Sequence, residues 1–168
     1  PHIEEFTLEF CALASGSKGN AIFVGTDRRG VLVDAGLPGR RIESRFRSVG
    51  LDPKQVAALV VTHEHRDHLA GVGVWARRFR IPVYMTETCH RAASLVLGPR
   101  GLDKVEVRLF EAGKTFCAAD LEFLPVSTSH DAADSVGFRI SDGATVVGFA
   151  TDLGFASHLV RHTLKDVH

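Results

Sequence analysis

The sequence predicts a layered α/β fold in which helices lie outside two sheets. Strand-like and helix-like hydrophobic patterns alternate through the first two thirds of the chain, and a run of strand patterns follows in the last third. This order is typical of layered folds with two sheets. Polar candidate ligands also follow several of the expected strands, which predicts a site at one edge of the layers.

Each element rests on a local pattern. The expected strands lie at residues 6–10, 21–24, 31–33, 56–62, 81–85, 105–110, 121–126, 136–140 and 144–150. The expected helices lie at residues 39–49, 68–79, 87–97 and 157–164. The first helix carries Ile42, Phe46 and Val49 at spacings of four and three residues, which is typical of an amphipathic helix. We interpret the arginines on its polar face as a solvated helix face rather than as a nucleic-acid patch.

Length and composition predict one domain spanning residues 1–168. The 20 basic and 20 acidic residues cancel, so global charge argues neither for nor against a nucleic-acid partner. Three cysteines, an odd number with no C-x-x-C spacing, predict reduced and mostly buried thiols and a cytoplasmic location. No apolar stretch approaches the roughly 18–20 residues of a membrane span, so no membrane association is expected.

The densest chemical signal is a cluster of three imidazoles and two carboxylates in the six residues that follow the strand at 56–62. Histidine and aspartate are ligands of zinc and similar divalent ions. Alternate residues of an extended or looped backbone project the same way, so His63 and His65 can converge on one ion. Asp67 and His68 can then reach a second ion. A polar loop with chance histidines is the alternative, and the density of the cluster disfavours it.

Three further polar residues follow strands. Asp34 could cap the surface or orient a metal-bound histidine. His130 could supply the third nitrogen that His63 and His65 need, and Asp152 places another carboxylate at a strand end. The loop at residues 15–20 resembles a phosphate-cradling loop only superficially, so a hairpin loop is the favoured interpretation and a substrate-facing role is the other.

The run Thr62-His63-x-His65-x-Asp67-His68 resembles the H-x-H-x-D-H signature of the metallo-β-lactamase superfamily. Further blocks resemble its YycJ-like (WalJ-like) branch, and they lie at residues 13–17, 19–20, 34–37, 62–65, 129–134 and 150–154. The resemblance covers nearly the whole chain. It implies a four-layer αββα sandwich with a metal site at one rim.

The resemblance also implies roles for individual residues. The first ion takes His63, His65 and His130, the second takes Asp67 and His68, and Asp152 bridges the two. Asp34 supports the site without binding metal. A hydroxide that bridges the ions is the nucleophile, and the catalytic Asp67 orients it or takes its proton. The expected ions are zinc or manganese, with iron as a further choice. The expected substrate-binding residues are Ser15, Ser17, Asn20, Asp134 and Ser135.

The implied function is a metal-dependent hydrolase that acts on nucleic acid, with a DNA exonuclease of the cytoplasm as the leading hypothesis. A carboxylate at Asp152 disfavours the β-lactamases, in which cysteine or serine is usual there. Two alternatives stay open: a thioester or small-ester hydrolase of the glyoxalase II type, and a non-catalytic metal-binding fragment. The oligomeric state is left open, with a dimer among the choices.

The chain departs from the family pattern at its end. The family places a further metal histidine roughly two dozen residues beyond the bridging aspartate, whereas His168 is the last residue here. His158 and His162 do not match that position. The expectation is therefore a chain truncated at the C-terminus, in which the second half of the fold lacks strands and helices and the second ion lacks a ligand.

Overall fold

The computed structural model describes residues 8–167 and contains two sheets. The first has six strands in sequence order, β1 (Glu9–Ala14), β2 (Ala21–Gly25), β3 (Gly30–Val33), β4 (Val56–Val60), β5 (Val83–Thr86) and β6 (Val107–Phe110). The second has four strands, β7 (Phe116–Ala118), β8 (Leu121–Ser127), β9 (Val136–Ser141) and β10 (Val146–Phe149). The first three strands pair antiparallel, whereas β3 to β6 pair parallel.

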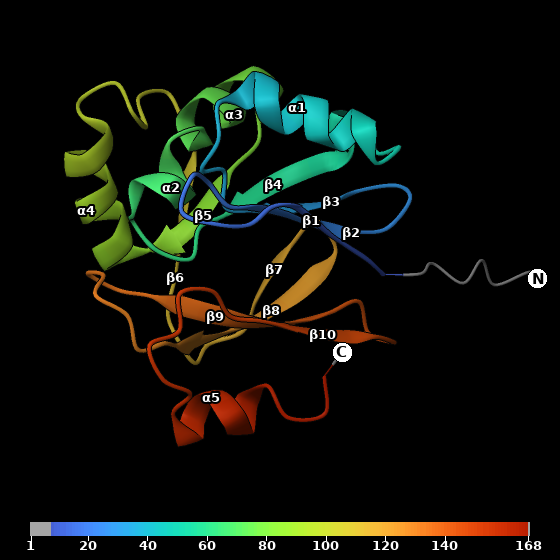
Figure 1. The fold of residues 1–168 in the computed structure, drawn as a ribbon, viewed down its shortest axis with the longest axis vertical. Helices are drawn as coiled ribbons and strands as arrows, with labels where there is room; N and C mark the ends of the chain where they lie inside the picture. The colour runs from blue at the N-terminus through green and yellow to red at the C-terminus, as the bar shows by residue number, and fades with distance from the viewer. Residues whose placement is uncertain (1–7, 168) are drawn as a thin grey trace, which may run out of the picture.

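Helices cover the outer faces of both sheets, which gives four layers (Figure 1). The first-sheet side carries α1 (Gly39–Ser48), α2 (Arg66–Leu69), α3 (Val72–Phe79) and α4 (Glu87–Leu97), together with a short 3-10 helix at Pro53–Gln55. The second-sheet side carries α5 (His158–Thr163), whose Val160 is buried. The predicted αββα layering is therefore confirmed. Within residues 8–167, no helix is both long and apolar enough to cross a lipid bilayer.

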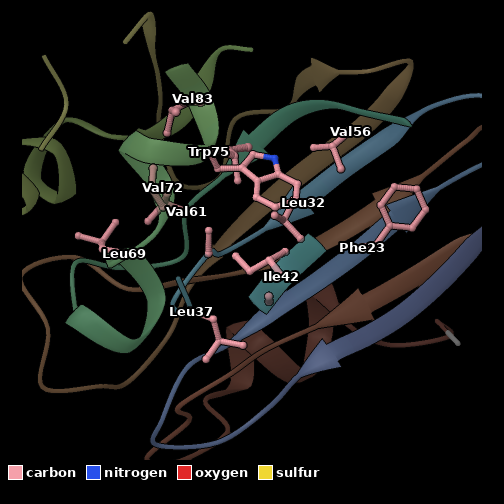
Figure 2. Packing of buried hydrophobic residues seen from close by; sticks show 14 of the residues in the cluster. Phe23, Leu32, Leu37, Ile42, Val56, Val61, Leu69, Val72, Trp75 and Val83 are labelled. Carbon is pink, nitrogen blue, oxygen red and sulfur yellow. The ribbon is translucent and has the colours of Figure 1, made fainter. Parts of the chain in front are cut away.

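Two apolar clusters hold the layers together. The first lies between the helices and the first sheet and includes Phe23 and Trp75 (Figure 2). The Phe46 ring stacks 5.8 Å from Trp75 and meets Phe23 at 5.5 Å between centroids. The second lies between the sheets, where the Phe123 and Phe138 rings meet edge to face at 5.7 Å. Burial of each such side chain stabilises the fold by about 1.5–3 kcal/mol, so both sheets are firm supports for the loops at their ends.

The structure corrects several predicted boundaries. The helix expected at 68–79 is two helices, because the chain turns between α2 and α3, where the Gly71 N–H donates to the Ala35 carbonyl at 2.7 Å. A Cβ at Gly71 would lie 2.3 Å from the Leu37 carbonyl oxygen, so the turn needs glycine. The strand expected at 6–10 is β1 at Glu9–Ala14, and residues 6 and 7 lie outside the described residues.

Two smaller corrections concern the second half and the thiols. The structure contains a further strand that the sequence pattern does not predict, the three-residue β7, which pairs antiparallel with β8. Such a strand is too short to show a periodic pattern. All three cysteines are free thiols, with Cys89 buried and Cys11 half-buried, but Cys117 is exposed and so does not fit the expectation of burial.

Candidate metal centre

Three loops of the first sheet meet at the rim where β3 and β4 end, and backbone hydrogen bonds join them. The Asn20 N–H donates to the Asp67 carbonyl at 2.7 Å, and the Gly36 N–H donates to the Asn20 carbonyl at 2.8 Å. A Cβ on Gly36 would lie 1.5 Å from the Asp67 carbonyl oxygen, so only glycine allows this approach. The parallel pairing of β3 with β4 therefore places Asp34 beside the histidine cluster.

The first ligand group consists of His63, His65 and His130. One ring nitrogen from each lies within 4.8 Å of the other two. His130 Nε2 lies 3.1 Å from His65 Nδ1, and the His63 ring centroid is 4.7 Å from that of His130. His63 is fully buried, whereas His65 and His130 are half-buried. The fold thus brings together three imidazoles that come from both sheets and are up to 67 residues apart in the chain (130 − 63).

The second group consists of His63, His68 and Asp152, whose ligand atoms also lie within 4.8 Å of one another. Asp152 Oδ2 is 2.8 Å from His68 Nε2 and 3.9 Å from His63 Nε2. Asp67 stands at the edge of this group, with Oδ2 3.7 Å from His68 Nε2. Asp152 therefore lies within reach of His68 and of His63, and His63 is the residue that the two groups share.

An unpaired buried atom tests whether these groups fit a divalent ion. His63 Nε2 is buried and has no hydrogen-bond partner among the described residues. Buried polar atoms in native proteins are nearly always paired, so an unpaired one calls for a missing partner. Imidazole nitrogens and carboxylate oxygens are the donor set of zinc and related metals. The residues present therefore fit divalent metal.

Asp34 fixes the orientation of two candidate ligands. Its Oδ2 accepts from His68 Nδ1 at 2.7 Å and from the Thr62 hydroxyl at 2.8 Å, and its Oδ1 accepts from the Thr62 N–H at 2.9 Å. Because that hydroxyl donates to Asp34, its oxygen accepts from His63 Nδ1, 2.9 Å away. In both histidines Nδ1 is thus engaged, and Nε2 faces the site as a ligand atom.

Two aspartates of the candidate site, Asp34 and Asp152, have an unusual backbone conformation. Asp34 and Asp152 have φ values of +59° and +50°, in the left-handed region that non-glycine residues rarely adopt. Such conformations cost free energy and concentrate at functional sites. Both carboxylates lie on the candidate site, which agrees with that tendency.

Burial and charge shift the two central histidines in opposite directions. Burial, followed by the charge of His68, lowers the pKa of His63 to about 4. Burial also lowers the pKa of His68, but the hydrogen bond that His68 donates to Asp34 and the charges of Asp34, Asp152 and Asp67 outweigh it, so the pKa is raised. A neutral His63 is the form that binds metal, and polarisation by Asp34 makes His68 a more basic ligand.

The residues predicted to bind substrate are not gathered in one place. Ser15 and Ser17 are exposed on the β1–β2 loop, and Asp134 is partly buried. Asn20 is buried, and its Nδ2 lies 2.9 Å from His68 Nε2 and 3.4 Å from Asp67 Oδ2. Ser135 is buried as well, and its hydroxyl accepts from the Thr128 hydroxyl at 2.8 Å. The side chains of Asn20 and Ser135 are thus engaged within the protein.

Two residues of the site were missed in the sequence. The Thr62 hydroxyl lies between Asp34 and His63, and Glu64 accepts a hydrogen bond from the loop that carries His130. Both lie in the run Thr62-His63-Glu64-His65, and only their position beside the two histidines could have indicated a role. Neither has a periodicity or a spacing that separates it from a neighbour with no role.

Comparisons with known proteins agree with this geometry. A family model described as Metallo-beta-lactamase superfamily matches residues 14–167. The chain is 36% identical over 158 residues to a Bacillus anthracis protein named Exodeoxyribonuclease YycJ, covering 94% of this chain and 59% of that protein. It is 34% identical over 157 residues to Exodeoxyribonuclease WalJ of Streptococcus pneumoniae serotype 2, covering 92% and 58%. The chain thus spans less than two thirds of the length of these relatives.

Solved structures share the fold at low sequence identity. A Cronobacter sakazakii metallo-beta-lactamase with a HARLDQ motif superposes with a TM-score of 0.69 at 13% identity, covering 84% of this chain and 60% of that one. The metallo-beta-lactamase fold protein YhfI from Bacillus subtilis gives a TM-score of 0.61 at 17% identity, covering 80% and 55%. At these identities the likeness is one of fold.

Proposed function

Because the chain belongs to the metallo-beta-lactamase superfamily, we propose that it is part of a metal-dependent phosphodiesterase that acts on nucleic acid, with DNA as the substrate. The observation that carries this proposal is the pair of ligand groups that share His63, one completed by His65 and His130 and the other by His68 and Asp152. Adjacent groups of this kind suit two neighbouring ions. Zinc or manganese, or iron as a further choice, are the proposed metals.

Two divalent ions bound there would stabilise negative charge on a phosphodiester and acidify water. The protein's own groups complete the chemistry. Asp67 is the candidate proton acceptor, because its side chain is 32% exposed and its Oδ2 is held by the Asn20 amide at 3.4 Å. Asp152, 38% exposed, presents its carboxylate between His63 and His68 and faces the solvent from which substrate enters.

Cations on the first-sheet rim favour a polyanionic substrate. Lys18 lies two residues before Asn20, and Arg66 lies one residue before Asp67, so the hydrogen bond between Asn20 and Asp67 brings these segments together. Both side chains are exposed, and neither pairs with a carboxylate of the described residues. Exposed cations of this kind are the usual contacts to phosphate in nucleic-acid complexes.

The names of the two relatives, both exodeoxyribonucleases, favour DNA over RNA and over a small phosphodiester. The cytoplasm is the proposed location, since free thiols such as Cys89 stay reduced there. The activity and the substrate are proposed by likeness to relatives of which this chain spans less than two thirds. The activity of this chain alone is part of the proposal.

The test compares three substrates with the same protein preparation. The protein, loaded with manganese or zinc, is given bis(p-nitrophenyl) phosphate, end-labelled DNA and an acyl-glutathione thioester. The expected result is hydrolysis of the first two, loss of both on chelation, and no hydrolysis of the thioester. Turnover of the thioester alone would favour the glyoxalase II type of activity. Metal binding without any hydrolysis would favour a non-catalytic fragment.

A further inference from the structure

We infer that Glu64 is a positioning residue that sets the place of His130 relative to His63 and His65. The inference rests on the proposed function only in taking these three histidines as metal ligands. Glu64 stands between His63 and His65 in the sequence, but its side chain contacts the loop that carries His130. Its Oε1 accepts a hydrogen bond from the Ala133 N–H at 2.7 Å, across 69 residues of sequence.

The loop that carries His130 has few other restraints, and the one beside His130 is the hydrogen bond from the Gly154 N–H to the Ser129 carbonyl at 2.7 Å. Its base is closed by two hydrogen bonds, from the Thr128 N–H to the Ser135 carbonyl at 2.9 Å and between their hydroxyls at 2.8 Å. Within residues 131–134, the bond from Ala133 to Glu64 is the hydrogen bond that reaches another segment of the described chain. Glu64 therefore holds the tip of a loop whose base is already closed, and His130 lies between base and tip.

The burial of Glu64 argues against a role in stability alone. The residue is 8% exposed, and its Oε2 is buried without a hydrogen-bond partner among the described residues. Burying a carboxylate with one oxygen unpaired is unfavourable. The Ala133 N–H needs only one acceptor, so the unpaired second oxygen adds nothing to stability, and the contact with the loop is what Glu64 contributes. The backbone alternation that turns His63 and His65 toward the site turns Glu64 toward the loop.

The geometry specifies which substitutions preserve the contact. Glutamine keeps the side-chain length and an oxygen acceptor but has no charge. Aspartate keeps the charge but is one methylene shorter, so its oxygens fall short of the Ala133 N–H. If the length of the side chain decides the contact, Glu64→Gln keeps the hydrogen bond to Ala133, whereas Glu64→Asp and Glu64→Ala lose it. If the charge decides it, Glu64→Asp keeps the contact and Glu64→Gln loses it.

The experiment measures zinc affinity of the full chain by competition with a chromophoric chelator. We expect Glu64→Ala and Glu64→Asp to weaken zinc binding by about 10–100-fold, as loss of a group that orients a ligand typically does. Glu64→Gln should stay within a factor of about three of the unsubstituted protein. Glu122→Ala removes an exposed carboxylate on β8 and serves as the matched control, with no change expected.

A second measurement does not depend on metal. Amide hydrogen exchange at Ala133 should be protected in the unsubstituted protein and in Glu64→Gln, and fast in Glu64→Asp. If the unsubstituted protein bound no metal, the proposed function would fail while this exchange pattern still tested the role of Glu64. Unchanged zinc affinity in Glu64→Ala, or equal losses in the Gln and Asp variants, would overturn the inference.

Discussion

The two sheets hold their shares of the candidate metal centre in different ways. On the first-sheet rim, His63 and His68 are fully buried, and each Nδ1 is engaged by Thr62 or Asp34. On the second-sheet rim, His130 is half-buried on an irregular loop, and Asp152 has a side chain that is 38% exposed. The ligands on the first rim are thus buried and held by side-chain hydrogen bonds, whereas those on the second rim lie on more exposed loops.

This difference separates two tasks within one site. The first rim fixes the ring orientation of its ligands before any ion is present, which lowers the entropic cost of binding. The second rim supplies ligands from loops, which are the usual location of residues that contact substrate. Changes on the first rim should therefore affect metal binding and folding together, and changes at exposed side chains should affect activity with little effect on folding.

The largest effect, on hydrolysis and on metal binding together, is expected for His63→Ala, because both ligand groups share this residue. Phosphodiester hydrolysis should fall by at least about a thousandfold, which corresponds to about 4 kcal/mol of transition-state stabilisation. Steady-state rates on bis(p-nitrophenyl) phosphate provide the measurement. His90→Ala, a change at a half-buried helical histidine outside both groups, is the control and should leave the rate unchanged. Equal rates for the two variants would contradict the ligand assignment.

Asp67→Ala should abolish hydrolysis with little loss of stability. Its carboxylate is 32% exposed, and its hydrogen bond from Asn20 is long, at 3.4 Å. The free energy of unfolding should therefore change by no more than about 0.5 kcal/mol, as for ordinary surface substitutions. Denaturant titration and turnover are measured on the same preparation. Turnover equal to that of the unsubstituted protein would exclude the proposed role of Asp67.

Asp34→Asn tests the first rim itself. Asparagine tolerates the left-handed backbone at this position, but its amide lacks one of the two oxygens that accept from Thr62 and His68. We expect metal affinity to fall by about 10–100-fold. Breaking a buried charged contact should also lower the free energy of unfolding by about 3–5 kcal/mol. Loss of metal affinity without loss of stability would mean that the network does not support the fold.

The smallest effect is expected for the exposed cations. Replacing Lys18 and Arg66 by alanine should weaken binding of single-stranded DNA and reduce the slope of log affinity against log salt by about 0.7 per cation. Rates on bis(p-nitrophenyl) phosphate should not change. Lys54→Ala is the control, because Lys54 is an exposed cation just before β4, at the end opposite the site. An unchanged salt slope in the double variant would show that DNA does not cross this rim.

Local patterns in the sequence predicted the regular elements well where they were long. The helix at Glu87–Leu97 has the predicted bounds, and the helix at Gly39–Ser48 ends one residue early. The turn at Gly71 escaped prediction because its cause is the Ala35 carbonyl, which is distant in the sequence. The strand at Phe116–Ala118 is held by its pairing with β8 rather than by a pattern of its own.

In the candidate site, too, local sequence patterns predicted some residues, whereas others depend on contacts between distant segments. Density of ligand types alone pointed to His63, His65, Asp67 and His68, because these residues are neighbours. His130 and Asp152 are 65 or more residues from His65, so only their place after expected strands pointed to them, and the bridging role of Asp152 depended on the family resemblance. Residues whose role is to hold others, such as Thr62 and Glu64, could not be predicted from spacing. Their function depends on hydrogen bonds that form only in the folded chain.

Metal content is the most direct test of the central claim that these imidazoles and carboxylates bind catalytic ions. The purified chain is dialysed against zinc or manganese at low concentration, and bound metal per chain is counted by elemental analysis beside His63→Ala. We predict two ions per chain in the unsubstituted protein and loss of both in the variant. No bound ion in the unsubstituted protein, or the same metal content in both proteins, would contradict the account.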